Sequence, residues 1–192
     1  SCVKMDNITK NVSPMSLQIR LYYCGMRGIN LLADLTNYIM LEMGQPTHAF
    51  DANKIDEIVV DTPKEDCKFV TLDNTERDIT TDTLLIQNGT TPVAIAGIMG
   101  GLDSEIVGDT DAGVLECANF DGISVRKSSS RLGHRTDASA RYEKIVRLIF
   151  FCVFLSQEFP IVKFGVVCPN IAVSILPNTK NFPLVTSFYC DY

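Results

Sequence analysis

His48 is the first candidate for chemistry in this sequence. The helix predicted before it ends at Gly44 and Pro46, so the histidine is expected in a loop beside a rigid element. Loops in this position often carry functional groups, and an imidazole gains or loses a proton near neutral pH. Thr36 and Asn37 are polar candidates on the same helix. The alternative is a packed, hydrogen-bonded loop histidine, with the two polar residues on the solvated side of the helix.

Glycines interrupt the apolar segment 92–101, which is predicted to form a strand. Glycine weakens a strand unless another backbone or a ligand comes close, so the N–H group of Gly97 is a candidate contact for a bound group. The glycine spacing differs from the dinucleotide-binding fingerprint, and no P-loop lysine follows, so nucleotide phosphate binding is not indicated. The alternative is a tight turn built from small residues.

Glu116 lies in the stretch 113–118, at the end of a predicted strand that has a buried-looking sequence. A carboxylate in apolar surroundings is costly unless it has a partner, which makes this residue a functional candidate. An ionised carboxylate only accepts hydrogen bonds, so in a pocket it would recognise a hydroxyl donor. The alternative is a strand-end glutamate turned toward water.

Two arginines, Arg135 and Arg141, surround a predicted helix start at Thr136. Unpaired N–H groups at a helix start suit an anion or an ester carbonyl. The alternative is a capped helix with an exposed, charged first turn. His134 has no evident catalytic partner in the sequence.

Motifs of other site classes are missing from the sequence. The 7 Cys form no C-x-x-C pair, and with 2 His they make no zinc pattern. No G-x-S-x-G or H-E-x-x-H motif occurs either. The scattered, odd number of Cys predicts reduced thiols in a cytosolic protein, and no secretory signal is visible. The missing initiator Met suggests a fragment.

The elements that position these candidates predict an α+β fold. Helices are expected over about 14–24, from Ser13 as N-cap, and from Asn30 to Gly44. In the second helix the spacing predicts an apolar stripe that leaves Asp34 off the core face, made of Leu32, Leu35, Ile39 and Met43. Strand-length apolar runs follow, and then helical composition returns. The predicted strands include 58–60, 69–72, 84–86, 92–99 and 114–115, and the later helices 121–131 and 137–146. Helices segregated from a mixed or antiparallel sheet layer give this class.

Composition divides the chain near residue 147. The 192 residues are 46% hydrophobic and 21% charged, as expected for one globular domain or slightly more. Residues 147–192 carry few charges, and their longest uncharged run, 164–179, is too short and too proline-rich for a membrane anchor. Two interpretations of this tail stay open. Either it forms strands of a second small unit, or it is sequence that does not belong to the ancestral reading frame. The net charge of −6 predicts that any RNA contact is local.

Three ordered motifs, in residues 35–51, 94–101 and 135–139, resemble the central editing domain of the bacterial-type phenylalanyl-tRNA synthetase beta subunit. The resemblance covers about residues 11–146 and ends where the composition changes. It implies domain boundaries of 1–146 for the editing, tRNA-binding domain and 147–192 for an apolar tail that does not resemble the family and is aberrant or poorly ordered.

The resemblance implies a hydrolase that removes tyrosine wrongly attached to tRNA(Phe). His48 would be the catalytic residue beside the aminoacyl ester, and no metal is expected. The substrate-binding residues would be Glu116 and Gly97 at the tyrosine hydroxyl, Thr36 and Asn37 near the ester, and Thr136 and Ala138 in the pocket wall.

The resemblance also implies partners and a location. ATP and magnesium serve the synthetase as a whole, at the alpha-subunit active site, and no cofactor is expected in this chain. The expected partners are the acceptor end of tRNA(Phe) and, through the full-length beta chain, the alpha subunit, in the cytoplasm. The alternative is a non-catalytic RNA-binding or scaffold fragment, or a truncated gene product without activity alone.

Overall fold

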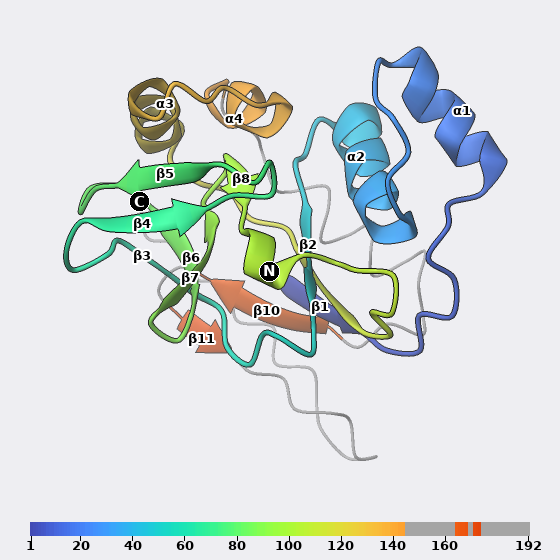
Figure 1. The fold of residues 1–192 in the computed structure, drawn as a ribbon, viewed down its shortest axis with the longest axis horizontal. Helices are drawn as coiled ribbons and strands as arrows, with labels where there is room; N and C mark the ends of the chain where they lie inside the picture. The colour runs from blue at the N-terminus through green and yellow to red at the C-terminus, as the bar shows by residue number, and fades with distance from the viewer. Residues whose placement is uncertain (145–163, 169–170, 174–192) are drawn as a thin grey trace.

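A first strand, two helices, a run of strands and two further helices follow one another along the chain (Figure 1). This computed structural model describes residues 1–144, 164–168 and 171–173. The helices are α1 (Met15–Tyr23), α2 (Leu31–Met43), the 3₁₀ turn η1 (Leu102–Ser104), α3 (Gly122–Arg131) and α4 (Asp137–Tyr142). The strands are β1 (Cys2–Met5), β2 (His48–Asp51), β3 (Val59–Asp61), β4 (Cys67–Val70), β5 (Glu76–Ile79), β6 (Leu85–Asn88), β7 (Thr91–Ile95), β8 (Met99–Gly100), β9 (Gly113–Glu116), β10 (Phe164–Cys168) and β11 (Ile171–Val173).

The strands form three sheets, and every described pair is antiparallel. The largest sheet has the order β11-β10-β1-β9-β2, the second β3-β6-β7-β8, and β4 pairs with β5 in a hairpin. In Figure 1, α3 and α4 lie together beside this hairpin, and α1 and α2 lie at the other end of the view. The predicted α+β class, with antiparallel strands and separate helices, is confirmed.

One large core joins the two main sheets to the last two helices. Phe50 of β2 and Leu85 of β6 are fully buried in it, and Val125 of α3 and Tyr142 of α4 pack against the same cluster. A smaller cluster of Leu32, Ala49 and Ile106 lies under α2. Because β2 contributes to both clusters, it connects the α2 end of the molecule to the α4 end.

The two predicted N-terminal helices are confirmed, but the buried face of α2 is not the predicted one. Asn30 caps α2, as its side chain accepts a hydrogen bond from the Ala33 N–H group, and Gly44 ends the helix in a left-handed conformation. The expected apolar stripe includes Leu35, which is more than one third exposed, whereas Asp34 is buried. Asp34 accepts hydrogen bonds from the Ser13 hydroxyl at 2.6 Å and the Ile29 N–H group at 2.8 Å. These bonds compensate for burying the carboxylate and turn a polar face of α2 inward.

Ser13 was expected to cap α1 and does not do so. Pro14 occupies the N-cap position, without a side-chain hydrogen bond, because the Ser13 hydroxyl donates to Asp34 of the next helix. A polar residue before a proline can therefore serve a tertiary contact in place of the local cap that its position suggests.

Three strands, β1, β2 and β5, are missing from the sequence-based prediction, and the single strand predicted over 92–99 is two strands, β7 and β8, separated by a turn at residues 96–98. β1, β2 and β5 are each only four residues long, and β5, Glu-Arg-Asp-Ile, is mostly charged. Strands this short carry too few alternating residues for a period-two pattern to be visible. The consequence for the site is that His48 begins a strand, and its predicted place in a loop is wrong.

Of the tail, the structure describes only β10 and β11. β10 pairs with β1, with Cys2 opposite Gly165 and Val3 opposite Phe164. The other residues of the predicted apolar tail (147–163, 169–170 and 174–192) lie outside the described residues. Within the described ranges, no helix is long and apolar enough to cross a bilayer.

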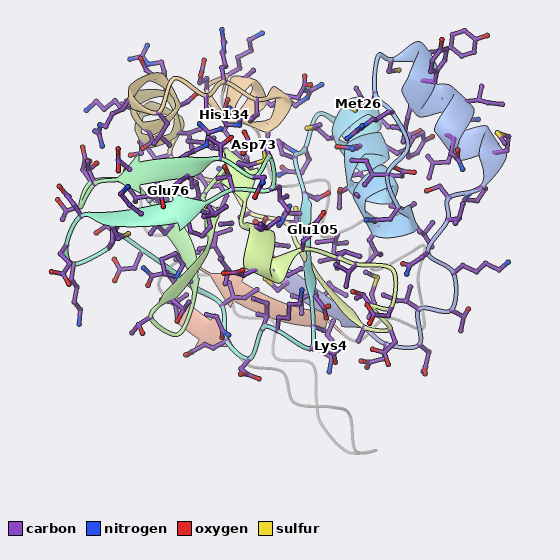
Figure 2. The ribbon with its side chains drawn as sticks, in the orientation of Figure 1. Lys4, Met26, Asp73, Glu76, Glu105 and His134 are labelled. Carbon is purple, nitrogen blue, oxygen red and sulfur yellow. The ribbon has the colours of Figure 1, made fainter. Side chains whose placement is uncertain are left out.

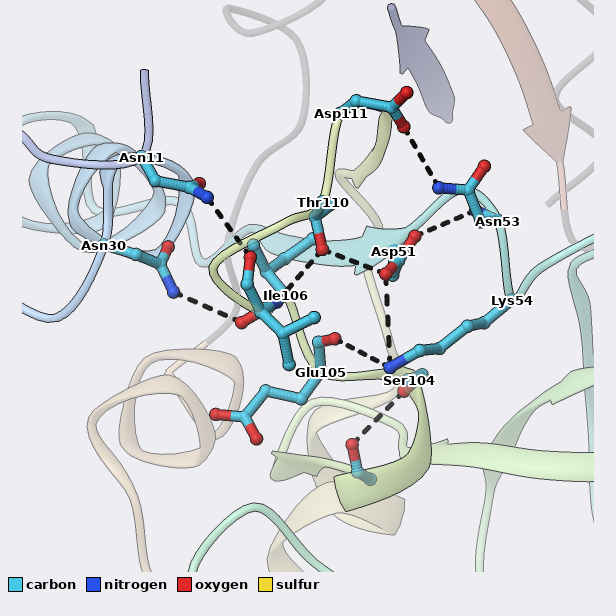
Figure 3. Close-up of polar contacts among 12 residues, drawn as sticks. Asn11, Asn30, Asp51, Asn53, Lys54, Ser104, Glu105, Ile106, Thr110 and Asp111 are labelled. Atoms are coloured by element: carbon cyan, nitrogen blue, oxygen red, sulfur yellow. Dashed lines mark hydrogen bonds and ion pairs between the residues drawn. The ribbon is translucent and has the colours of Figure 1, made fainter. Parts of the chain in front are cut away.

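A network of polar side chains fixes the loop between η1 and β9 (Figure 3). Asp51, at the end of β2, is 4% exposed and accepts hydrogen bonds from the Thr110 hydroxyl at 2.9 Å and the Asn53 N–H group at 2.9 Å. Lys54 donates to the Glu105 carbonyl at 3.2 Å, and Asn30 donates to the Ile106 carbonyl at 3.5 Å. These bonds hold the loop against both β2 and α2.

Candidate functional site

One cavity of about 530 Å³ lies between α2, β2, β9 and the segment from β7 to α4. Its volume is within the range of small-molecule sites in proteins. Every predicted site residue lines it, namely Thr36, Asn37, His48, Gly97, Glu116, Thr136 and Ala138. The structure therefore brings residues from widely separated parts of the chain to one place. What each residue does there stays a prediction.

The position of His48 relative to Glu116 follows from strand pairing. β2 and β9 are antiparallel neighbours, and His48 lies directly opposite Glu116. Side chains directly opposite one another in an antiparallel pair lie on the same face of the sheet. Both side chains therefore face the same cavity from adjacent strands. Cys2 of β1 lies opposite Glu116 on the other side, and burial, with the nearby Glu116 charge, raises the pKa of its thiol to about 11.

Glu116 is a buried carboxyl group with an unused hydrogen-bonding atom. The residue is 5% exposed, and its Oε1 atom has no hydrogen-bond partner among the described residues. Burial raises the pKa of Glu116 from 4.5 to about 7, against a smaller opposing effect of the N-terminal amino group. An unsatisfied buried acceptor costs about 1 to 3 kcal/mol, which a ligand hydroxyl facing this atom would relieve.

The imidazole of His48 is partly buried and lies against an aromatic ring. The rings of His48 and Phe50 are 4.6 Å apart between centroids and nearly perpendicular, at 79°. Burial lowers the pKa of His48 from 6.5 to about 4, so the ring is neutral at physiological pH. A neutral imidazole has one N–H donor and one acceptor nitrogen, which suits the orientation of a water molecule.

Gly97 lies in the turn between β7 and β8, and this agrees with the alternative of a tight turn. Its φ of +70° is in the left-handed region, which favours glycine. A Cβ atom at this position would lie 2.9 Å from Tyr142 Cδ2 and 3.1 Å from Val125 Cγ2. The turn therefore brings bare backbone to the cavity wall while its other side packs on the core.

Thr136 and Ala138 form the cavity wall at α4. The Thr136 hydroxyl accepts from the Ser139 N–H group at 3.1 Å and donates to the Ile98 carbonyl at 3.0 Å. A capping box with Ser139 completes this helix start. The hydroxyl of Thr136 thus already has two partners, which suits a wall residue better than a ligand contact.

The two arginines near α4 are paired with acidic side chains of the same segment. Arg135 contacts Glu143 at 3.0 Å, and Arg141 contacts Asp137 at 3.1 Å. With these pairs and the capping box in place, the alternative of a capped helix with a charged first turn fits this segment better than an anion site.

Thr36 and Asn37 approach the cavity from α2. Thr36 is buried, whereas the alternative placed it on the solvated side of the helix. Its hydroxyl donates to the Ala33 carbonyl one turn earlier, at 2.8 Å. The Thr36 carbonyl in turn accepts from the Thr47 hydroxyl at 3.5 Å. α2 is in this way connected to the residue before His48.

Several lining residues were not predicted from the sequence. Arg27, between α1 and α2, lines the cavity, as do Asp73 and Glu105, which are labelled in Figure 2. Tyr142 lines it from α4, and its buried hydroxyl donates to the Ala118 carbonyl at 3.0 Å. Only Tyr142 had a sequence signal, as an aromatic residue in a helix that must bury one face. No cluster of metal-ligating side chains occurs among the described residues.

Comparisons with known proteins give the chain its family. Residues 1–150 match the family model described as "B3/4 domain". The phenylalanine–tRNA ligase beta subunit of Clostridium tetani is 49% identical over 142 residues, which is 73% of this chain and 18% of that protein. The same subunit of Streptococcus thermophilus is 46% identical over 162 residues, 80% of this chain and 20% of that protein. The chain thus spans about a fifth of the length of these relatives.

Among solved structures, an N-terminal fragment of the phenylalanyl-tRNA synthetase beta subunit from Pyrococcus horikoshii is similar, with a TM-score of 0.42 and 13% identity. The matched region covers 59% of this chain and 37% of the fragment. The resemblance inferred from the three motifs is confirmed by the family model and by the bacterial relatives. This chain belongs to the B3/4 domain family, and most of its sequence matches part of the phenylalanine–tRNA ligase beta subunits.

Proposed function

We propose that this chain is an editing module that hydrolyses tyrosine from wrongly charged tRNA(Phe). The observation that carries the proposal is the buried Oε1 atom of Glu116, which has no hydrogen-bond partner in the described part of the chain and lies in a cavity that His48 and Gly97 also line. The tyrosine hydroxyl would meet Glu116 and the Gly97 backbone, and the aminoacyl ester would lie near His48. The names of the bacterial relatives support a role in charging tRNA with phenylalanine.

The proposed selectivity depends on one hydrogen bond. A synthetic site for phenylalanine rejects a substrate with an added hydroxyl by only about 100-fold, whereas a site that needs the hydroxyl can discriminate more strongly in the other direction. Bound phenylalanine would leave Glu116 without a partner, at a cost of about 1 to 3 kcal/mol. That range corresponds to a preference for tyrosine of about 5- to 140-fold, since each 1.4 kcal/mol is a factor of ten.

The proposed chemistry is the attack of an oriented water molecule on the ester. The water oxygen bonds to the carbonyl carbon, the bond to the ribose oxygen breaks, and the water proton passes to that oxygen. With a pKa of about 4, His48 is a weak base and would mainly orient the water. No Ser or Cys is among the described lining residues, which agrees with a reaction without a covalent enzyme intermediate.

Partners and location follow from the same proposal. The substrate would be the acceptor end of tRNA(Phe), and the ligase alpha subunit would be a partner of the complete beta subunit. Protein synthesis in a bacterial cell would place both in the cytoplasm. In this proposal, the chemistry at the cavity needs no cofactor of its own.

The test is hydrolysis of tyrosyl-tRNA(Phe) and phenylalanyl-tRNA(Phe) by the chain and by Glu116→Ala. We expect the wild-type chain to prefer the tyrosyl substrate and the variant to lose that preference, by about 5- to 140-fold. Glu42→Gln, on the exposed side of α2, is the matched control and should behave as wild type. Equal, background-level release from the wild type and Glu116→Ala would instead favour a non-catalytic RNA-binding or scaffold role.

A further inference from the structure

The imidazole of His48 is held in place by packing. Burial is the only cause of its lowered pKa among the described residues, with no contribution from a neighbouring charge or hydrogen bond. Phe50 supports one side of the ring in an edge-to-face contact, with the ring centroids 4.6 Å apart. A functional histidine is often oriented by a carboxylate, so here another feature must fix the ring.

Gly100 of β8 makes a second close approach to the same ring. A Cβ atom added to Gly100 would lie 2.6 Å from both Cε1 and Nε2 of His48 and 3.0 Å from Leu72 Cδ1. Real Cβ atoms essentially never approach another atom closer than 3.0 Å, so the ring occupies space that only glycine leaves free. Gly100 is not among the residues with positive φ, so its backbone conformation does not itself require glycine.

We propose that Gly100 is a positioning residue for His48. The missing side chain lets the imidazole lie against the β8 backbone while it also contacts Phe50, with His48 opposite Glu116 in the β2–β9 pair. Any larger residue at position 100 would push the ring into the cavity, toward the place of the substrate ester. The effect on hydrolysis rests on the proposed function, whereas the effect on the ring itself does not.

The test uses Gly100→Ala in the complete chain, with two measurements. By NMR titration of the imidazole, we expect the pKa of His48 to move up from about 4 toward 6.5, because the displaced ring gains water. For tyrosyl-tRNA(Phe) hydrolysis, we expect kcat to fall by up to about 100-fold, with KM changed less than about twofold, because misplacing a group by about 1 Å has effects of this size.

The matched control is Gly108→Ala, where an added Cβ atom meets nothing within 4 Å. It should leave both the pKa of His48 and kcat unchanged. A double-variant cycle keeps the test valid if Gly100→Ala folds poorly. In the His48→Ala background the new methyl group has room, so adding Gly100→Ala should lower Tm much less than it does in the wild type.

Each result decides one point. An unchanged pKa of His48, or equal Tm losses from Gly100→Ala in the wild-type and His48→Ala backgrounds, would overturn the positioning role. If the wild-type chain does not hydrolyse the substrate, the proposed function fails, while the titration and the cycle still test Gly100. If the wild type hydrolyses it and Gly100→Ala is equally fast, the proposed function stands and the positioning role fails.

Discussion

Glu116 and His48 lie directly opposite one another on β9 and β2, and burial shifts their pKa values in opposite directions. Both shifts favour the uncharged form of the side chain. The pKa of Glu116 rises from 4.5 to about 7, so the folded protein keeps it protonated where the unfolded chain does not. The pKa of His48 falls from 6.5 to about 4, so the folded protein keeps it neutral where the unfolded chain is protonated. Between these values the cavity holds two uncharged groups.

These shifts predict how stability depends on pH. The contribution of Glu116 is complete below pH 4.5 and is lost as pH rises through about 7, whereas that of His48 is present above pH 6.5 and is lost as pH falls toward about 4. Between pH 4.5 and 6.5 the two slopes oppose each other. For Glu116 the full contribution is on the order of 3 kcal/mol, at 1.36 kcal/mol for each pKa unit.

Single variants should reveal the two slopes separately. We expect the free energy of unfolding of Glu116→Gln to rise between pH 4 and 6.5, and that of His48→Gln to fall between pH 4.5 and 7. Urea unfolding at closely spaced pH values measures both, with the wild type as the reference. Wild-type pH dependence in Glu116→Gln would show that this carboxyl does not titrate differently in the folded protein.

The sequence carried part of the information on these residues. Glu116 was a candidate because a carboxylate in an apolar strand needs an explanation, and its burial agrees with that argument. The role of Gly100 was not predictable, because it depends on which imidazole lies beside the β8 backbone. That contact joins residues 52 positions apart and exists only once β2 and β8 have their final places.

At the scale of elements, the cavity depends on a loop as much as on strands and helices. The loop after η1 supplies Glu105 and Ile106 to the cavity, and its position is fixed by the hydrogen bond from Thr110 to the buried carboxylate of Asp51. Thr110 is itself 3% exposed, and its hydroxyl also accepts from the Val107 N–H group at 3.0 Å. The Thr110 hydroxyl therefore connects two positions of the loop to each other and to β2.

Removing this hydroxyl should loosen the loop without disturbing the core. We expect Thr110→Val to lower the free energy of unfolding by about 1 to 3 kcal/mol, because the buried Asp51 carboxylate loses one hydrogen bond. Urea unfolding measures the change, and hydrogen exchange should show faster exchange at residues 105–110. Thr91→Val, at an exposed strand position, is the control. Equal stability of the two variants would mean that the network does not hold the loop.

Elements were predictable where local rules decide them. Asn30 and Gly44 mark the ends of α2 because capping and left-handed termination are local events. The buried face of the same helix was predicted wrongly, because Asp34 turns inward to bind Ser13, a partner from outside the helix. Strand β2 was missed for a related reason, since four residues after a proline become a strand only by pairing with β9.

At the scale of the molecule, charge is distributed unevenly around the cavity. Residues 51–116 contain 15 acidic and 4 basic side chains, whereas residues 7–33 and 122–136 contain no acidic residue. The two acid-free segments carry α1 and α3, and both reach the cavity, through Arg27 and Thr136. The acidic residues of segment 51–116 would repel the phosphates of an RNA end that enters the cavity. Only the acid-free segments that carry α1 and α3 would attract them.

This distribution limits the number of phosphates that the chain can neutralise. Arg131 and Arg135 are already paired with Asp82 and Glu143, so few basic side chains remain available. With about three phosphate contacts, the slope of log K against log salt should be about −2 to −3, since each contact contributes about −0.7 to −0.9. Affinity for tRNA(Phe) would then fall by about 16- to 64-fold between 50 and 200 mM salt.

The helix α3 allows this limit to be tested on the chain itself. Arg126 and Lys127 are exposed on α3, within the acid-free segment 122–136, so replacing both by Ala should weaken tRNA binding and make the salt slope shallower by about 1 to 2. Lys68→Ala, which removes the partner of Glu76 in the acidic hairpin, should leave the slope unchanged. Fluorescence anisotropy with labelled tRNA(Phe) at several salt concentrations gives all three slopes. A wild-type slope steeper than about −6 would require many more phosphate contacts than these helices can provide, and RNA would then have to bind over a different surface.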